Sequence, residues 1–460
     1  MTSVVVFCLD SVRKDYFDRY ANRIKKMSDF SMTDCRSGSS WSVPSHASFL
    51  TGSLPSEHGI HTYNMDFSTV KREDVITGQL ANHHSTYVSA NQFTTPEFGF
   101  NSWFDSGYPI SAGRHFPKGI DAKNSNGIQN HIYRSLQADH PVKSFLNGIV
   151  LKIDYMADDK PIANLLDDGC KPISKRALHT ATDHRENLFM FINMMEAHIP
   201  HRLFRGMDQE QFDLSPEWSS HMIDHWDYNE SDEEELDEFS EDLDRFREFY
   251  AAAIEYLDRR ISVLIEQLED VLHDDVVAIV MADHGENLGG KYDRYLMEHT
   301  GALTEGLLHV PFEVVNSPID IDGEESLFSL CELPDLVTAI INGEDYVLGT
   351  NPVSAEVIGE GLHLDGKESN YWNRGIRCAY HNGSKFEWDT FGNQFRIDIN
   401  IEGPSTELVV EEDVTLDNKL YERFETDLQS YNDNCKYQED MKSKKVSEST
   451  EARLRELGYL

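Results

Sequence analysis

Short apolar runs alternate with amphipathic segments along the first three quarters of the chain. Residues 4–9, 188–194 and 276–281 are apolar throughout or nearly so, and their lengths are typical of buried strands. Residues 86–90 and 310–315 are further candidate strands. Strands that alternate with helices predict an α/β fold, in which helices sandwich a large, mostly parallel sheet.

Helices are predicted where apolar residues recur at spacings of three and four. The longest has its apolar positions at Phe246, Tyr250, Ile254, Leu257, Ile261, Leu264 and Leu268. A shorter helix is expected at residues 42–52, with Pro44 in its first turn and Gly52 at its C-terminal end. Residues 333–341 predict another helix. Residues 98–185 carry few clear patterns, and we expect loops and short helices there, over one end of the sheet.

The pattern changes after about residue 341, where short alternating segments such as 385–388 and 394–399 appear. They predict a smaller antiparallel α+β subdomain. A terminal helix at residues 451–457 is expected to pack back onto the body.

We therefore divide the chain into an α/β domain, residues 1–345, and a C-terminal α+β subdomain, residues 346–460. Within the first domain, residues from about 208 to 244 are strongly acidic. A run of this kind is typical of a solvated insertion.

The charge balance is far from neutral. Asp and Glu number 81 and Lys and Arg 41, which gives a formal net charge of −40. Such a chain does not bind nucleic acid by neutralising phosphates. Acidic residues occur from the first predicted helix to the last, which favours adaptation to a high-salt cytoplasm over an excess confined to one tail or loop.

The cysteines and the N-terminus bear on the cellular compartment. The six cysteines are widely spread and form no C-x-x-C pair, which argues against a disulfide framework or a zinc-thiolate site. The apolar N-terminal run has no basic segment before it, and no apolar run reaches transmembrane length. We expect a cytoplasmic protein without membrane insertion.

Polar residues follow three of the predicted strands. Asp10 ends the first, Glu196 and His198 follow the second, and Asp283 and His284 follow the third. The carboxyl ends of parallel strands share one edge, where ligands bind, so these groups are expected to converge. A single Asp after a strand is more often a turn residue, but three such endings favour a functional site.

Two carboxylates and an imidazole, from Asp10, Asp283 and His284, suit a divalent cation with an open coordination position. The structural alternative for Asp283 and His284 is a tight turn. Ser42 precedes the helix opened by Pro44, so its hydroxyl would lie among free backbone N–H groups, suited to hold a tetrahedral oxyanion. By itself, an ordinary capping serine is the commoner explanation.

Several segments resemble the sulfatase family. Residues 42–52, Ser-Val-Pro-Ser-His-Ala-Ser-Phe-Leu-Thr-Gly, closely resemble its signature C/S-x-P-S-R-x-x-L-x-T-G, and residues 55–59 its P-x-x-H-G continuation. Further matches, in family order, are residues 9–15 to D-D/T-x-R-x-D, 195–200 to M-D-x-H-x-P, 282–286 to S-D-H/N-G-E, 309–311 to R/H-V-P, and also residues 333–337 and 454–459. Together the matches cover most of the chain and identify it as a member of the sulfatase branch of the alkaline-phosphatase superfamily.

The resemblance implies an alkaline-phosphatase-like fold and one divalent metal ion. Asp10, Asp283 and His284 would hold that ion, which is most often Ca²⁺ in the family, with Mg²⁺, Mn²⁺ or Zn²⁺ as alternatives. The usual second Asp of the metal segment is Ser11 here, which weakens the site or shifts its selectivity.

The resemblance also implies catalytic residues. Ser42 would be the nucleophile, or the precursor of a formylglycine nucleophile. His46 stands close to it, where the signature has the arginine that formylglycine-forming enzymes usually require. His198 would touch the ester oxygen and protonate the leaving group, and His299 would contact the anionic part of the substrate.

The activity expected is hydrolysis of the sulfate ester of a small molecule or glycan. An alternative on the same site is a phosphodiesterase or a transferase of phosphate-linked head groups. A non-catalytic binder of anionic glycans is disfavoured, because Ser42 and the Asp283–His284 pair are all present.

Overall fold

A computed structural model describes residues 2–442, apart from some single or paired positions and the stretches 112–115, 159–162, 360–368 and 401–405. The strands of its central sheet are β1 (Ser3–Leu9), β2 (Phe30–Arg36), β3 (His84–Ser89), β4 (Ser106–Pro109), β5 (Leu188–Met194), β6 (Val276–Met281), β9 (His309–Val315) and β11 (Phe328–Ser329). Their order is β11-β2-β9-β6-β1-β5-β3-β4. Only β9 runs antiparallel to its neighbours, so the predicted mostly parallel sheet is confirmed.

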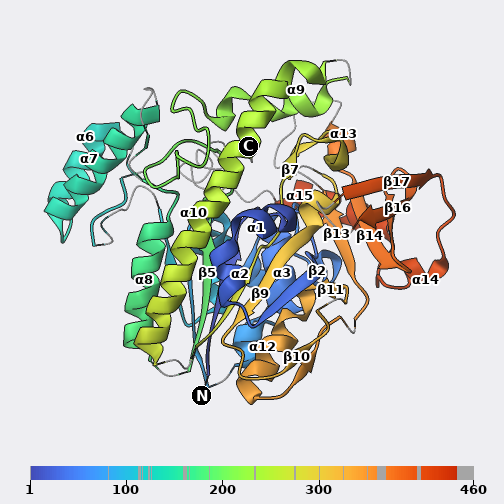
Figure 1. The fold of residues 1–460 in the computed structure, drawn as a ribbon, viewed down its shortest axis with the longest axis horizontal. Helices are drawn as coiled ribbons and strands as arrows, with labels where there is room; N and C mark the ends of the chain where they lie inside the picture. The colour runs from blue at the N-terminus through green and yellow to red at the C-terminus, as the bar shows by residue number, and fades with distance from the viewer. Residues whose placement is uncertain are drawn as a thin grey trace.

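The middle of this sheet is apolar and closed to solvent. Strands β1, β5 and β6 lie side by side and are buried at every position, as their uninterrupted apolar runs predict. Helix α10 (Ser240–Leu272) crosses in front of the sheet in Figure 1 and packs against α1 (Lys14–Tyr20), α2 (Asn22–Met27) and α8 (Cys170–Asp183). Helix α3 (Ser42–Thr51) ends at Gly52, whose φ of 76° is the left-handed conformation of a helix cap.

Residues 98–185 contain longer helices than expected. They form α6 (Gly127–Gln137), α7 (Pro141–Asp158) and α8, which have 11, 18 and 14 residues. Helices α6 and α7 form a hairpin that stands off the body at the left of Figure 1. The expectation of loops and short helices was wrong there, because this hairpin does not turn an apolar face toward the sheet.

The acidic segment 208–244 is more ordered than a solvated insertion. It contains α9 (His225–Glu230) and the start of α10, and it buries Trp218 and Tyr228. The remaining short elements are β7 (Asn287–Leu288), β8 (Met297–Glu298), β10 (Ile321–Asp322), β12 (Tyr346–Val347), α4 (Pro55–His58), α5 (Ile76–Gln79), α11 (Glu305–Leu308), α12 (Leu333–Asn342), α13 (Ser369–Trp372) and α14 (Asn418–Tyr421).

The predicted C-terminal antiparallel sheet is also confirmed. Its strands follow one another as β13 (Ser354–Ile358), β14 (Gly375–His381), β15 (Ser384–Asp389), β16 (Gln394–Asn400) and β17 (Thr406–Glu412), with α15 (Leu428–Lys442) after them. Ion pairs join this sheet to the main body, among them the buried pair of Lys385 with Glu305 and the pair of Arg294 with Glu387. The boundary at residues 345 and 346 stays a prediction, and the helix expected at 451–457 lies outside the described residues. Within the part of the chain that is described, no helix has both the length and the apolar character needed to cross a membrane.

Candidate active site

Four neighbouring parallel strands, β6, β1, β5 and β3, direct their carboxyl ends to the same edge of the sheet. Asp283 lies two residues past β6, Asp10 directly follows β1, Asn193 is the last residue but one of β5, and Asn91 lies two residues past β3. All four side chains are buried. The edge is the place where open α/β sheets bind ligands.

Asp10 is held by two amide side chains that sequence reasoning missed. The Nδ2 atoms of Asn91 and Asn193 donate to Asp10 Oδ2 over 2.8 and 3.0 Å. Each had a signal in the sequence: Asn91 directly follows the predicted strand 86–90, and Asn193 is the only strongly polar residue in the apolar run 188–194. Both amides fix the orientation of the Asp10 carboxyl group at the end of β1.

Asp283 faces Asp10 across the site. Its Oδ1 accepts hydrogen bonds from the backbone N–H groups of Ser11 and His284, over 3.4 and 3.0 Å. Ser11 has a φ of 63°, so the chain leaving β1 turns its N–H toward this carboxylate. Burial by itself would raise the pKa of Asp283, but His284 and His46 nearby lower it well below its usual range, and the carboxylate is ionised.

Ser42 is the first residue of α3, and its hydroxyl lies between the other groups. Its Oγ is 3.4 Å from each carboxylate oxygen of Asp10 and 3.3 Å from His284 Nε2, and it accepts a hydrogen bond from Asn91 Nδ2 over 3.0 Å. The N-terminus of the helix adds a positive electrostatic potential there. A nucleophile and the expected metal ligands therefore share one small volume.

The donor set fits a divalent cation. One ligand atom from each of Asp10, Asp283 and His284 lies within 4.8 Å of the others, and all three residues are buried. His284 Nδ1 donates to the carbonyl oxygen of Gly285 over 2.8 Å, which leaves Nε2 as the nitrogen with the lone pair. Burial lowers the pKa of His284, but Asp283 and Asp10 raise it more, which shows how strongly this pocket attracts positive charge. A cation held there would neutralise an anionic ester and favour ionisation of a hydroxyl.

His46 lies one helical turn after Ser42 and faces Asp283. Its Nε2 is 3.0 Å from Asp283 Oδ2, and its ring packs edge-on against Phe49 and Phe191. Cys8, His46 and Asp283 form another group of possible ligand atoms. Burial raises the pKa of the Cys8 thiol, and Asp283 and Asp10 raise it further, which makes this second group the poorer candidate.

His198 and His299 form a cluster with His284. Their ring centroids lie 5.2 Å (His198 to His299) and 5.1 Å (His284 to His299) apart. His198 Nδ1 donates to the carbonyl oxygen of Ile199 over 2.6 Å. Burial lowers the pKa of His198, and it lowers the pKa of His299 to about 3, so both imidazoles are neutral at pH 7.

Two glutamates lie near these strand ends, but only one of them, Glu286, points toward the histidine cluster. Glu286, which sequence reasoning quoted in a motif without giving it a role, lies 3.5 Å from His299 Nδ1, and burial raises its pKa to about 8. Glu196 was expected to converge with the other strand endings. Its Oε1 instead accepts a hydrogen bond from the backbone N–H of Cys170 at the start of α8 over 2.6 Å. A carboxyl group there complements the positive end of that helix.

Solved structures of distant relatives share this fold. The phosphonate monoester hydrolase of Agrobacterium radiobacter aligns over 86% of this chain and 89% of its own, with 12% identity and a TM-score of 0.57. A Vibrio parahaemolyticus protein of the alkaline phosphatase superfamily aligns over 96% and 87%, with 11% identity and a TM-score of 0.51. A 2-O GAG sulfatase aligns over 86% and 85%, with 11% identity and a TM-score of 0.50. At these identities the likeness shows an alkaline-phosphatase-like fold.

A match to a family model identifies the family of this chain. Curated protein sequences gave no match. The family model described as type I phosphodiesterase / nucleotide pyrophosphatase matches residues 4–296, well over half of the 460 residues. This stretch contains Asp10, Ser42, Asp283 and His284, and it ends just before His299. The chain belongs to the type I phosphodiesterase / nucleotide pyrophosphatase family.

Proposed function

We propose that this protein hydrolyses phosphoric esters of small molecules or glycans, with Ser42 as the nucleophile and a divalent cation held by Asp10, Asp283 and His284. One observation carries the proposal: Ser42 Oγ lies within 3.4 Å of Asp10 and His284, at the first turn of α3. Membership of a phosphodiesterase family favours phosphorus over sulfur as the atom attacked.

The proposed reaction has two displacements. Ser42 Oγ forms a bond to phosphorus as the bond to the leaving oxygen breaks, and water then displaces Ser42 from the phosphoserine. Ser42 would lose its proton to solvent, which a cation held at this site favours. His198 is neutral at pH 7, with its Nδ1–H engaged by Ile199, so its other nitrogen would take up a proton from water and pass it to the leaving oxygen, which is the general-acid role the sequence predicted. In the second displacement the attacking water loses one proton, and Ser42 Oγ regains one as it leaves phosphorus.

The other predicted residues support these steps in the proposal. His46 contacts Asp283, so we assign it to positioning that carboxylate. His299 is neutral at pH 7, and it would donate a hydrogen bond to the substrate anion, with no charge of its own. The imidazole of His284 suits Zn²⁺ or Mn²⁺ better than Ca²⁺, which prefers oxygen ligands.

Sulfate-ester hydrolysis is the second candidate, favoured by the resemblance of residues 42–52 to the sulfatase signature. It needs Ser42 to be oxidised to formylglycine, because the hydrate of that aldehyde expels sulfate by collapsing back to the carbonyl. A plain serine sulfate has no such exit. His46, in place of the signature arginine, disfavours that modification.

The test combines activity with the chemical state of residue 42. We expect hydrolysis of bis(p-nitrophenyl) phosphate to exceed that of p-nitrophenyl sulfate, and Ser42→Ala to lower it by about 10³-fold or more. Thr51→Ala, at the other end of α3, should retain activity within about twofold. Mass spectrometry of the native peptide should find unmodified serine. A residue 42 lighter by two hydrogens, together with faster sulfate-ester hydrolysis, would replace this proposal with the sulfatase assignment.

We also propose that the acidic surface adapts the chain to high salt. A net charge of −40 repels itself, and salt screens that repulsion. The melting temperature should rise steadily from dilute buffer to molar KCl. A flat or falling curve would contradict the proposal.

A further inference from the structure

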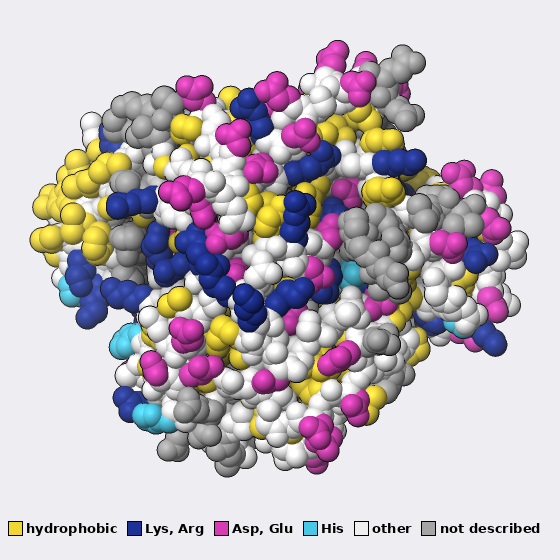
Figure 2. All heavy atoms as spheres, in the orientation of Figure 1, with side chains coloured by type: hydrophobic (Ala, Val, Ile, Leu, Met, Phe, Trp, Pro, Cys, Tyr) yellow, Lys and Arg dark blue, Asp and Glu magenta, His cyan; other side chains and the backbone are white. Residues whose placement is uncertain are grey.

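The hairpin of α6 and α7 exposes its apolar side chains. Eight of the seventeen large apolar side chains that are exposed in the described part of the chain belong to it: Ile128, Ile132, Tyr133, Leu136, Val142, Leu146, Ile149 and Ile153. On α6 the exposed aliphatic residues recur every four positions, and on α7 every three or four, so each helix presents one continuous apolar stripe to the outside. Figure 2 shows these side chains gathered at the left edge of the molecule.

The inner face of the same hairpin is mostly polar. Its buried residues are the polar His131, Ser135, Ser144 and Asn147, together with one apolar residue, Leu151. His131 Nε2 donates to the carbonyl oxygen of Ser144 over 2.8 Å, and Asn147 Nδ2 donates to the carbonyl oxygen of Ile120 over 2.9 Å. The polar groups are thus hydrogen-bonded inside, and most of the apolar groups face out.

The two helices also approach each other closely. A Cβ added at Gly148 would lie 2.5 Å from the His131 ring, and the neighbouring inner positions Ser135 and Ser144 are small. Small residues and hydrogen-bonding side chains between helices, with large apolar residues outside, are the arrangement of helices that pack in an apolar surrounding. In water, hydrophobic burial would favour the reverse arrangement.

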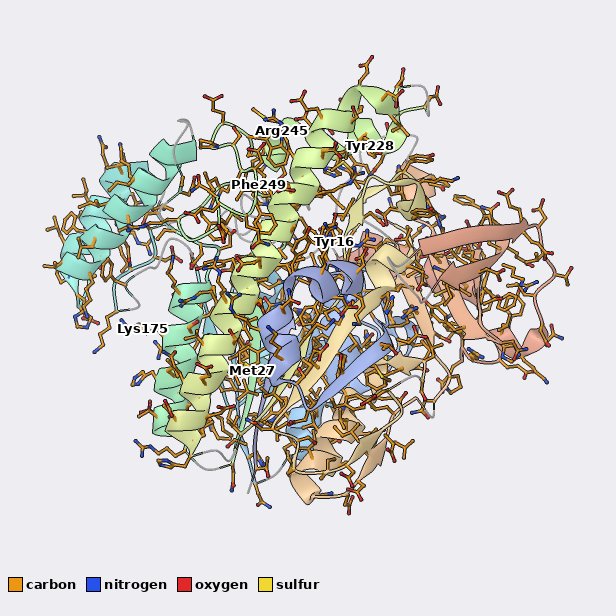
Figure 3. All side chains as sticks on the ribbon, viewed as in Figure 1. Tyr16, Met27, Lys175, Tyr228, Arg245 and Phe249 are labelled. Atoms are coloured by element: carbon orange, nitrogen blue, oxygen red, sulfur yellow. The ribbon has the colours of Figure 1, made fainter. Side chains whose placement is uncertain are left out.

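The charge of this region differs from that of the whole chain. Residues 127–158, which span both helices, contain three Lys or Arg and three Asp, so the hairpin is neutral, whereas the chain has a net charge of −40. Lys175 of α8 lies on the same side of the molecule in Figure 3, and Figure 2 shows basic side chains along the border of the apolar patch. A basic rim around an apolar patch complements an anionic surface.

We infer that the α6–α7 hairpin docks this protein onto an anionic lipid surface. Its apolar stripes would enter the boundary between headgroups and acyl chains, with Arg134, Lys143 and Lys152 near the lipid phosphates. The hairpin lies in the interface and does not span it, in agreement with the absence of a membrane-crossing helix among the described residues. A second copy is a poorer partner for this surface, because a symmetric contact would place the basic rims of two chains together.

Vesicle sedimentation of the full chain tests the inference. We expect the protein to bind phosphatidylglycerol vesicles at least tenfold more tightly than phosphatidylcholine vesicles. Hydrogen–deuterium exchange on the unaltered protein should show that amides within residues 127–153 gain protection when phosphatidylglycerol vesicles are added. This second measurement needs no variant.

Two sets of substitutions locate the contact. The combined variant Ile132→Ser, Leu136→Ser, Leu146→Ser, Ile149→Ser should lower vesicle binding at least tenfold. The matched control, Met222→Ser, Val263→Ser, Val347→Ser, Phe391→Ser, removes four exposed apolar side chains elsewhere and should change binding less than twofold. Replacing Arg134, Lys143 and Lys152 by Gln should reduce the preference for phosphatidylglycerol at least threefold.

Three results would overturn the inference. The first is absence of binding to either kind of vesicle. The second is equal loss of binding in the hairpin variant and its control, or protection from exchange outside residues 127–153 only. The third is a particle of twice the chain mass that the hairpin variant converts to a monomer, without vesicle binding, because it would assign the patch to a second copy.

Discussion

Helix α10 and the α6–α7 hairpin are both amphipathic, and they face opposite ways. In α10 the residues at spacings of three and four, such as Leu257, Ile261 and Leu264, are buried. Figure 3 labels two residues of the same helix, of which Phe249 is fully buried and Arg245 has a side chain that is 41% exposed. In the hairpin the apolar stripe, with Leu136 at 64% exposed, faces out.

The difference shows that the spacing of apolar residues defines which face of a helix is apolar. Whether that face turns toward the core or toward solvent depends on what packs against the helix. Helix α10 packs against α1, α2, α8 and strand β6, so its apolar face lies in the main hydrophobic core. The hairpin stands off the body and packs mainly on itself, through polar groups. Its apolar face is complete only with a partner outside the chain.

The largest expected effect is on activity, and it distinguishes a buried polar residue of the active site from one of the hairpin. Asp283→Asn should lower ester hydrolysis by about 10³-fold or more, some 4 kcal/mol in the activation barrier, because it removes one anionic metal ligand. Asn147→Ala removes a buried polar group of the hairpin, and it should leave activity within about twofold. Steady-state rates with saturating metal, and circular dichroism to check folding, make the comparison.

Either of two outcomes would break this contrast. Full activity of Asp283→Asn, or full activity after exhaustive chelation, would remove the metal site from the proposal. Loss of activity in Asn147→Ala would show that the hairpin supports the catalytic groups directly.

The next effect concerns the apolar faces. Leu264→Ala should lower the free energy of unfolding by about 2–5 kcal/mol, because it leaves a cavity under α10. Ile149→Ala, where the side chain is 54% exposed, should cost less than about 0.5 kcal/mol. Urea unfolding of both variants measures the difference. Equal losses would mean that the outer face of the hairpin is packed in the folded chain.

The smallest effect is a pH dependence in the main body. His61 is buried beside Tyr63 and Tyr431, and burial lowers its pKa to about 4. In the unfolded chain its pKa is about 6.5, so between these values the unfolded state binds more protons. The free energy of unfolding therefore falls as pH falls below about 6.5, by up to about 1.4 kcal/mol per pH unit from this residue.

His61→Gln should remove that dependence, and the measurement is the difference in unfolding free energy between the two proteins at pH 7 and pH 5. His179→Gln, at an exposed position, serves as the control and should keep the original dependence. If His61→Gln follows the same curve as the unaltered protein, His61 is not held neutral in the folded state.

Many of the strands and helices were predicted from the local pattern of apolar and polar residues. The strands β5 and β6 match the predicted ranges 188–194 and 276–281 residue for residue. Helix α10 was predicted from its periodicity, although it begins at Ser240, before the first predicted apolar position. Strands β2, β4 and β11 of the central sheet were not predicted; β4 and β11 have only four and two residues, too few to establish a period of two.

The candidate site also contains residues that the sequence predicted and residues that it did not. Asp10, Ser42, Asp283 and His284 were named from strand endings, a helix start and family motifs, and the structure brings them together. Asn91 and Asn193 were not named, because their local signals do not show that strands β3, β5 and β1 are adjacent, which is what brings them to Asp10. Glu196 ends a strand as Asp10 does, yet it turns to α8.

By itself, then, the sequence determined which segments are buried strands, where polar groups end them, and which residue types are available for chemistry. These features depend on neighbouring residues, so the spacing of hydrophobic residues is sufficient to predict them. Only the tertiary structure decided which strand ends are adjacent and which way an amphipathic face points. Side-chain partners across a sheet and around a helix come from residues far away in the chain, so Asn91 joins Asp10 and the α6–α7 hairpin turns its apolar face outward.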